Sequence, residues 1–158
     1  MTNIMKSAIA LVAMFGLALP AAAQEQPISL AGDVMLVKVE TSETGESKTT
    51  LVEPGVIVPG DRLIFGTDYA NSGAQAVNDF VVTNPVPSPV RLASDADPEL
   101  TVSVDGGKNW GKLGALTVTS EAGEARAAAH TDVTHVRWVL SVVKPGEKGR
   151  LEYPAIIR

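Results

Sequence analysis

Hydrophobic and polar residues alternate with a period of two along much of the chain, which is the pattern of a β-strand rather than a helix. Four strands are predicted from this alternation, over residues 62–69, 80–83, 135–142 and 150–157. In the first of them Leu63, Phe65, Thr67 and Tyr69 share one face. Strands with two distinguishable faces predict an antiparallel sheet that is covered on one side.

Turn-forming sequences separate these stretches at short intervals, among them PGD at 59–61, NSGA at 71–74, DGG at 105–107 and KPGEKG at 144–149. Spacings of roughly 8 to 12 residues between turns are typical of a β-sandwich or barrel. The alanines of 121–130 favour a helix, but Gly123 interrupts them, and we expect a loop with room for one helical turn. Because Pro154 has no amide hydrogen, we expect the last strand to lie at a sheet edge or to turn that position outward.

The first 23 residues have the features of a secretory signal peptide. Lys6 precedes an apolar run over 8–19, and Pro20 and three alanines follow before Gln24. The run is shorter than the roughly 20 residues that span a bilayer, so cleavage leaves no integral membrane segment. We therefore predict a signal peptide over 1–23, an N-terminal linker over 24–32 and a single β-sandwich domain over 33–158.

The composition of the chain argues against several classes of site and ligand. The chain has no cysteine, which excludes disulfides, a thiolate metal site and a catalytic thiol. After removal of the signal peptide, 12 basic side chains remain against 18 acidic ones, a net charge of −6. This charge opposes binding to nucleic acid or to anionic lipid.

Residues 59–87, PGDRLIFGTDYANSGAQAVNDFVVTNPVP, resemble the bacterial conserved repeat domain of the domain-of-unknown-function eleven type. Members of that family have Pro-Gly-Asp, an alternating strand, Asn-x-Gly, a second strand and then Asp-Pro-x-Pro. The corresponding residues here are Pro59, Gly60, Asp61, Asn71, Gly73, Asn84, Pro85 and Pro87, with Asn84 in place of the usual aspartate. The resemblance implies an immunoglobulin-like antiparallel β-sandwich in an exported or cell-surface protein. It extends more loosely over 133–138 and 144–153.

The same residues have a physical interpretation as turns, because glycine permits unusual backbone angles and Asn and Asp bond to nearby amides. Calcium ligation is the alternative, but carboxylates do not recur here at the spacing of a calcium loop. The acidic segment DADPE, with Asp95, Asp97 and Glu99, is the better cation candidate. A solvated acidic loop is the competing interpretation of that segment.

The stretch SVDGGKNW at 103–110 matches the Asp-box pattern S-x-D-x-G-x-x-W of bacterial sialidases. We interpret Ser103, Asp105, Gly107 and Trp110 as a structural hairpin, in which Asp105 accepts hydrogen bonds from turn amides and Trp110 packs across the strands. A sialidase-like propeller requires several such boxes in a far longer chain. The lone box therefore predicts a turn rather than a catalytic site.

Catalytic patterns are weak elsewhere. His130 and His135 are five residues apart, which fits neither the strand nor the helix spacing of zinc ligands, and no G-x-S-x-G elbow is present. The sequence thus predicts an exported, non-catalytic protein of the periplasm, cell surface or medium that needs no cofactor. Its partner is expected to be an unknown envelope protein or a second copy of itself. A small glycan- or calcium-binding module is the alternative, and a hydrolase suggested by the Asp-box is the third hypothesis.

Overall fold

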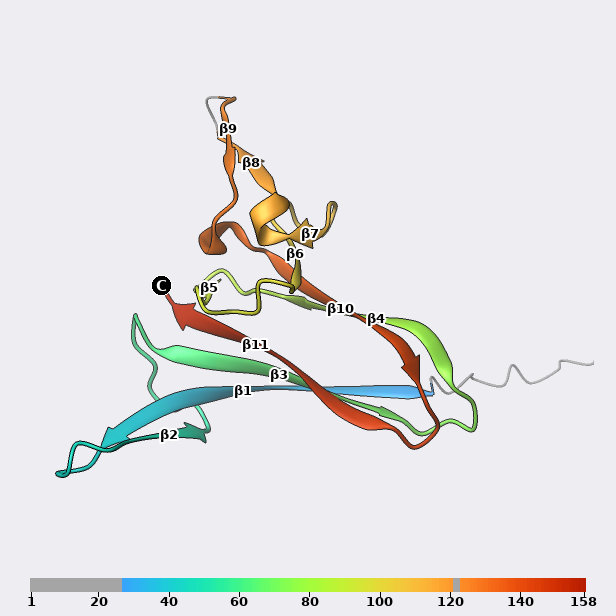
Figure 1. Cartoon of the computed structure of the whole chain (residues 1–158), viewed down its shortest axis with the longest axis horizontal. Coiled ribbons are helices and arrows are strands. Elements are labelled where there is room, and N and C mark those ends of the chain that lie inside the picture. Colours follow the sequence, from blue (N-terminus) through green and yellow to red (C-terminus); the bar gives the residue numbers. More distant parts are fainter. Residues whose placement is uncertain (1–26, 121–122) are drawn as a thin grey trace, which may run out of the picture.

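The computed structural model describes residues 27–120 and 123–158, so the predicted signal peptide lies outside the described residues. The chain forms an antiparallel β-sandwich with two short 3₁₀ helices (Figure 1). The elements are β1 Ile28–Thr41, β2 Ser47–Val52, β3 Arg62–Asn71, β4 Val77–Pro85, β5 Val90–Leu92, β6 Thr101–Ser103, β7 Gly111–Lys112, η1 Leu113–Ala115, β8 Thr117–Thr119, β9 Ala125–Ala127, η2 His130–Asp132, β10 His135–Val143 and β11 Lys148–Ile157. No helix in the described residues combines the length and the apolarity needed to cross a bilayer.

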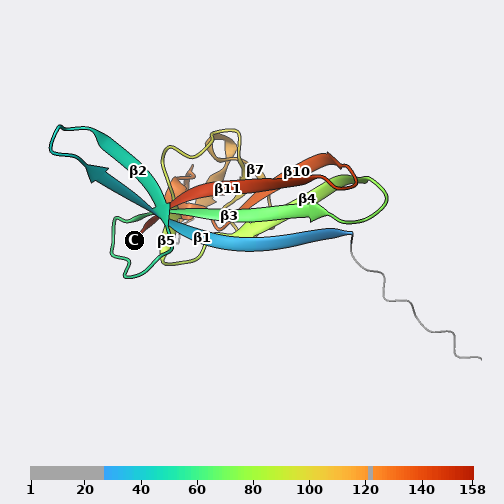
Figure 2. The same ribbon diagram turned by 90° about the horizontal axis from the view of Figure 1, so that it is seen from below.

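Two sheets form the layers of the sandwich. One has the strand order β2-β1-β3-β11-β5 and the other has the order β4-β10-β6-β7, while β8 and β9 form a separate two-stranded ribbon. The ribbon stands away from the sandwich, and the β1–β2 hairpin projects beyond it in another direction (Figures 1 and 2). The all-β antiparallel fold predicted from the alternation is therefore confirmed.

The inner faces of the two sheets form the core, and in β3, β4 and β11 they are the faces that the alternation predicted. At the end of β10 the alternation is wrong, because Val142 is 46% exposed and Val143 is buried. Leu63, Tyr153 and Ala155 come from the first sheet and Val82 and Val136 from the second, each less than 4% exposed. The ring of Tyr153 stacks on Phe65 with centroids 4.9 Å apart. The Tyr153 hydroxyl donates to the Pro85 carbonyl of the opposite sheet at 2.9 Å, so it satisfies its polar atom while joining the layers.

The predicted linker over 24–32 is wrong where it meets the described chain. Residues 28–32 belong to β1 and pair with β3, from Ile28 opposite Asn71 to Gly32 opposite Thr67. Pairing to a strand far along the chain fixes this segment in the sheet, and its own small residues give no clear alternation. The folded domain therefore begins at least five residues before residue 33.

Two other expectations concern the C-terminal half. The segment expected to be a loop with one helical turn contains strand β9, which pairs with β8, and the one turn η2. Strand β11 lies between β3 and β5, so it is not the edge strand that Pro154 suggested. The Pro154 carbonyl accepts a hydrogen bond from the Ala93 amide, next to β5. The main-chain groups of Pro154 therefore point toward β5, which pairs with β11 only from Ala155 to Ile157. The missing amide hydrogen therefore faces away from β3.

Candidate functional site

The Asp-box forms a compact hairpin turn after β6. The Ser103 hydroxyl donates to Asp105 Oδ1 at 2.8 Å, and the same oxygen accepts the amides of Lys108 and Asn109 at 3.0 Å each. Asp105 Oδ2 accepts the Asn109 side-chain amide at 2.7 Å. These donors, those of Asn109 first, hold the pKa of Asp105 far below its usual range. The carboxylate is thus committed to the turn in its charged form.

Trp110 closes the same turn. Its indole nitrogen donates to the Gly107 carbonyl at 2.9 Å, and Gly106 and Gly107 supply the positive φ angles of 79° and 87°. The Arg137 guanidinium lies 3.6 Å from the ring centroid, and the His135 ring meets the indole edge-on at 6.2 Å. An indole whose face is stacked by Arg137 stabilises the hairpin against β10 and does not offer that face to a sugar.

A serine, a carboxylate and a histidine do lie near one another here, but they do not form a catalytic triad. The Ser103 side chain is fully buried and gives its proton to Asp105, not to an imidazole. His135 Nδ1 is instead 3.1 Å from the Thr134 hydroxyl. A nucleophile needs an accessible oxygen whose proton passes to a base, and Ser103 has neither feature.

The residues of the repeat-domain pattern hold two turns together. Asn71 is 1% exposed, and its side-chain nitrogen donates to the carbonyls of Gln75 and Val143 at 2.9 Å each. Its side-chain oxygen accepts the Gly73 amide at 2.9 Å. The β3–β4 turn is thereby fastened to the end of β10, in the other sheet. Asn71 thus uses both of its side-chain donors and its side-chain oxygen to hold the turns.

The other residues of the pattern have structural contacts as well. After Pro59, Gly60 adopts φ 94° and donates to the Ile157 carbonyl, while the Asp61 carboxylate accepts the Val58 amide at 2.8 Å. Asn84 donates to the Thr67 hydroxyl of the opposite sheet at 2.6 Å. Since β4 ends at Pro85, the proline stands where the sequence predicted a strand end.

The three carboxylates of the acidic loop over 95–99 have separate partners. Asp95 pairs with Arg62 at 2.8 Å, Glu99 pairs with Lys112, and Asp97 accepts the amide of Glu99 at 2.9 Å. The hydrogen bond from Arg62 lowers the pKa of Asp95. In residues 27–120 and 123–158, no three His, Asp or Glu side chains are placed to share a metal ion. Two of the three carboxylates in the loop, those of Asp95 and Glu99, are therefore held in ion pairs.

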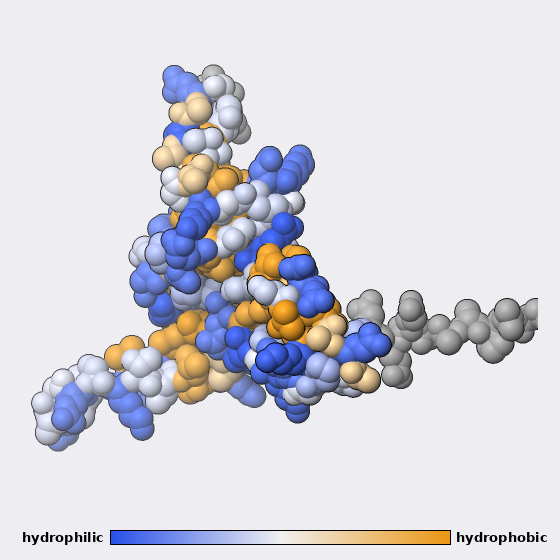
Figure 3. All heavy atoms as spheres, turned by 45° about the vertical axis from the view of Figure 1, so that its right-hand side comes forward, coloured by the Kyte–Doolittle hydropathy of each residue, from blue (hydrophilic) through white to orange (hydrophobic). Residues whose placement is uncertain are grey.

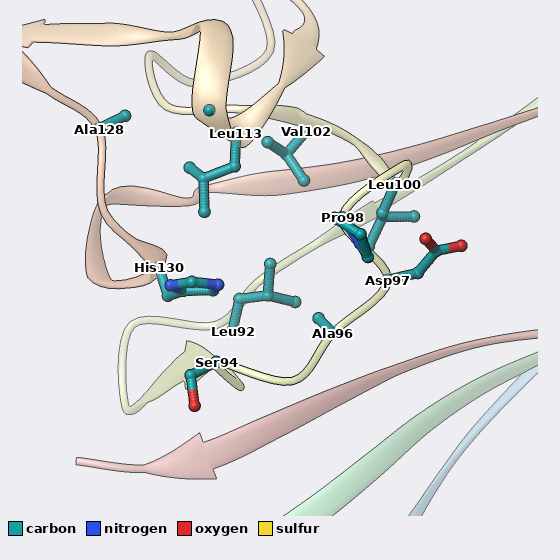
Figure 4. A pocket seen from close by; sticks show the side chains of 11 residues that line it. Leu92, Ser94, Ala96, Asp97, Pro98, Leu100, Val102, Leu113, Ala128 and His130 are labelled. Atoms are coloured by element: carbon teal, nitrogen blue, oxygen red, sulfur yellow. The ribbon is translucent and has the colours of Figure 1, made fainter.

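A hollow of about 340 Å³ lies beneath the acidic loop (Figure 4). Its wall is mostly apolar, and His130, Ser94 and Asp97 are the polar side chains around it. The volume is at the low end of small-molecule pockets. The Ser94 hydroxyl and the Asp97 carboxylate point away from His130 (Figure 4), so the three polar groups do not converge on one point. The apolar lining is contributed by Leu92, Ala96, Leu100, Val102, Leu113 and Ala128.

The projecting hairpin, which we call the arm, consists of residues 36–41 of β1 and the whole of β2. Cross-strand pairing places Val37 opposite Leu51 and Val39 opposite Thr49, so one face of the arm has no charge. The other face carries Lys38, Glu40 and Lys48. Val39 is 62% exposed and Leu51 is 48% exposed, and the following loop presents Val56 at 90%. Hydrophobic side chains gather near the base of the arm (Figure 3).

Sequence reasoning missed the arm, although the alternation of MLVKVE at 35–40 and the run KTTLV at 48–52 could have indicated a hairpin around the turn TGES. A two-stranded ribbon is marginally stable by itself in water. The amphipathic arm therefore resembles a contact region.

No family model matches the chain, and no curated protein or solved structure matches it. The resemblance to the bacterial conserved repeat domain thus stays a prediction, and the fold rests on the strand pairing described above.

Proposed function

We propose that the chain is an exported, non-catalytic, immunoglobulin-like β-sandwich that binds another protein of the bacterial envelope through the arm. The observation that carries this proposal is the exposure of Val39 and Leu51 on the uncharged face of the arm. The predicted signal peptide supports export to the periplasm, the cell surface or the medium, and the negative charge of the processed chain favours solubility.

Exposed apolar side chains at these positions favour a protein partner for an energetic reason. Burial of a valine or leucine side chain contributes about 1.5 to 3 kcal/mol, and the arm holds two of them on a face with no charge to desolvate. Extended ribbons also offer main-chain groups on their borders to an incoming strand. A partner that covers this face would both bind tightly and stabilise the arm.

The test is affinity capture from envelope extracts with the processed chain as bait, compared with two variants. Val39→Lys places a charge on the apolar face, whereas Thr44→Lys adds the same charge at the exposed arm tip. We expect one protein to bind stoichiometrically to the wild type and to Thr44→Lys, and to be lost with Val39→Lys. The captured protein, once purified, should bind saturably in calorimetry with the same order of preference.

Three results would overturn the proposal. The first is a captured protein that binds Val39→Lys as well as it binds the wild type, and the second is the capture of no stoichiometric partner at all. The third is a saturable calorimetric signal with calcium or with sugars in place of a protein, which would favour the glycan- or calcium-binding module instead.

A further inference from the structure

Strand β1 has an open border over most of its length. It pairs with β3 from Ile28 to Leu36, while β2 lies along its other border only from Leu36 onward. Among the described residues, no strand pairs with 28–35 on that second border. Figure 2 shows this part of β1 running along one side of the sandwich.

Two main-chain hydrogen bonds at the end of β3 show which main-chain groups of β1 point away from the sheet. Asn71 donates its amide to Glu147, on the β11 side, and Ser72 donates to Pro27, on the β1 side. Because main-chain groups alternate in direction along a strand, Ser29, Ala31 and Asp33 bond toward β3. The amides and carbonyls that point away from β3 belong to Ile28, Leu30, Gly32 and Val34.

The other long borders carry features that oppose strand addition. In β4, Asp79 has a left-handed φ of 50° and Pro85 lacks an amide hydrogen. In β11, β5 covers only the end from Ala155 onward, and Lys148 and Arg150 bring charge to the part that β5 leaves open. Proline, irregular backbone and basic side chains are the usual protections of an edge strand.

The open part of β1 has none of these protections. Residues 28–35, ISLAGDVM, include neither proline nor a basic side chain, and their backbone contains no left-handed residue. Their only charge, Asp33, is bound by Arg150 through two hydrogen bonds of 2.7 and 3.0 Å. An edge of this length without protection is ready to accept another strand.

We propose that a second copy of this chain pairs with the open border of β1, antiparallel and about a two-fold axis at Ala31. In that register Leu30 stands opposite Gly32 of the second copy and Ile28 stands opposite Val34, so that the outward main-chain groups meet as hydrogen-bonded pairs. The two sheets then continue into one. This surface is separate from the arm, so the inference stands independently of the proposed function.

Three features favour a second copy over a foreign strand. The border is limited at one end by Pro27 and at the other by β2, and the antiparallel copy of the same stretch fills that length. Leu30 is 50% exposed and would cover Gly32, above which a Cβ would meet only the Gly66 carbonyl at 3.8 Å. Ser29, whose hydroxyl donates to the Ala70 carbonyl at 3.3 Å, would stand opposite Asp33 of the second copy, so no like charges are opposed.

The first experiment removes a hydrogen-bond donor from the open border of β1 and leaves the pairing of β1 with β3 intact. Leu30→Pro removes an amide hydrogen that points away from β3, so the monomer should keep its circular dichroism spectrum. Leu30→Val is the matched control, since it keeps the amide. By sedimentation velocity over a range of concentrations, we expect the wild type and Leu30→Val to reach twice the monomer mass, and Leu30→Pro to stay monomeric. Val39→Lys should leave the dimer unchanged, which separates this inference from the arm.

The second experiment reads the register. The chain has no cysteine, so Ala31→Cys introduces a single thiol at the two-fold axis, where paired Cα atoms lie about 4.5 Å apart and a disulfide can close. Ser29→Cys is the control. Each copy of residue 29 stands opposite residue 33 of the other copy, so the two thiols are four positions apart along the strands and too far apart to link. We expect mild oxidation to link Ala31→Cys into a covalent dimer and to leave Ser29→Cys unlinked.

The inference is overturned by a wild type that stays monomeric at every concentration and gives no preferential Ala31→Cys link. It is also overturned by a dimer that survives Leu30→Pro, because another surface would then form it. Displacement of the second copy by a foreign envelope protein that competes for the same border would assign the border to that protein instead.

Discussion

The guanidinium of Arg150 lies over the backbone of Gly66 in the neighbouring strand β3, where a Cβ at residue 66 would overlap it. From this position Arg150 bonds to Asp33 at 2.7 Å, Asp68 at 3.1 Å and Glu152 at 2.5 Å. The hydrogen bonds, that of Asp33 first, raise the pKa of Arg150, and Arg150 in turn lowers the pKa of Asp33. Gly66 therefore gives the outer face of three strands a common ionic contact.

Replacement of Gly66 by alanine should move Arg150 off its carboxylates. Partly exposed ion pairs contribute about 0.2 to 1 kcal/mol each, so we expect Gly66→Ala and Arg150→Ala to be coupled by about 1 to 2 kcal/mol. A double-mutant cycle of denaturant unfolding measures this coupling. Gly55→Ala, at a loop position with open space around it, is the control. Additive effects of the two substitutions would contradict the prediction.

Substitution of Asn71 should be among the most destabilising single changes outside the hydrophobic core. Asn71→Ala leaves the carbonyl of Val143 and the amide of Gly73 without their side-chain partner. Each polar group that is buried without a partner costs about 1 to 3 kcal/mol, so we expect a loss of at least about 2 kcal/mol. Chemical unfolding measures it, with the exposed Asn78→Ala as control. A loss equal to that of Asn78→Ala would mean that the two turns are not fastened through this amide.

Stability should also depend on pH through Asp132. Two hydrogen bonds from Arg126 and one from the Ala129 amide lower the pKa of Asp132 from 3.8 to about 2. Because the folded-state pKa lies below the unfolded value, the stabilisation is complete above about pH 4 and is lost as the pH falls toward 2. Asp132→Asn should therefore be about 1 kcal/mol less stable than the wild type at pH 7, with the difference vanishing near pH 2.

Urea unfolding at both pH values checks this prediction. Other carboxylates with lowered pKa also lose stabilisation in acid, so the informative quantity is the difference between the wild type and Asp132→Asn. Glu124→Gln is the matched control, since Glu124 is exposed and lies beside strand β9, which carries Arg126. This variant should follow the wild type. A constant difference at all pH values would show that the asparagine acts through packing rather than through the charge.

The sequence predicted best those elements whose two faces meet different surroundings. In β3, β10 and β11 one face lies in the core and the other in solvent, so alternation reports the strand directly. The open part of β1 borders solvent along one edge and includes Ala31 and Gly32, so its residues alternate poorly. Its place in the sheet comes from pairing with β3, which no local pattern specifies.

The same limit applies to the candidate sites. The hydrogen bonds that Ser103 and Asp105 make within the Asp-box span at most four residues, and local turn chemistry can anticipate them. Asn71 reaches a carbonyl 72 residues away, and Arg150 reaches a carboxylate 117 residues away. Those contacts depend on strand register between distant segments, which a single sequence does not determine.

Disruption of the Asp-box should affect folding and not turnover. Ser103 is fully buried, and Ser103→Ala removes both the donor to Asp105 and the acceptor for the Gly107 amide, so we expect a loss of about 1 to 2 kcal/mol. In a Trp138→Phe background Trp110 is the only tryptophan, and its emission should shift to the red as the turn loosens. The exposed Ser141→Ala should change neither property. The contrary result would be sialoside hydrolysis that copurifies with the wild type and disappears with Ser103→Ala. The turn would then have to be reinterpreted as a catalytic element, because a purely structural hairpin has no activity to lose.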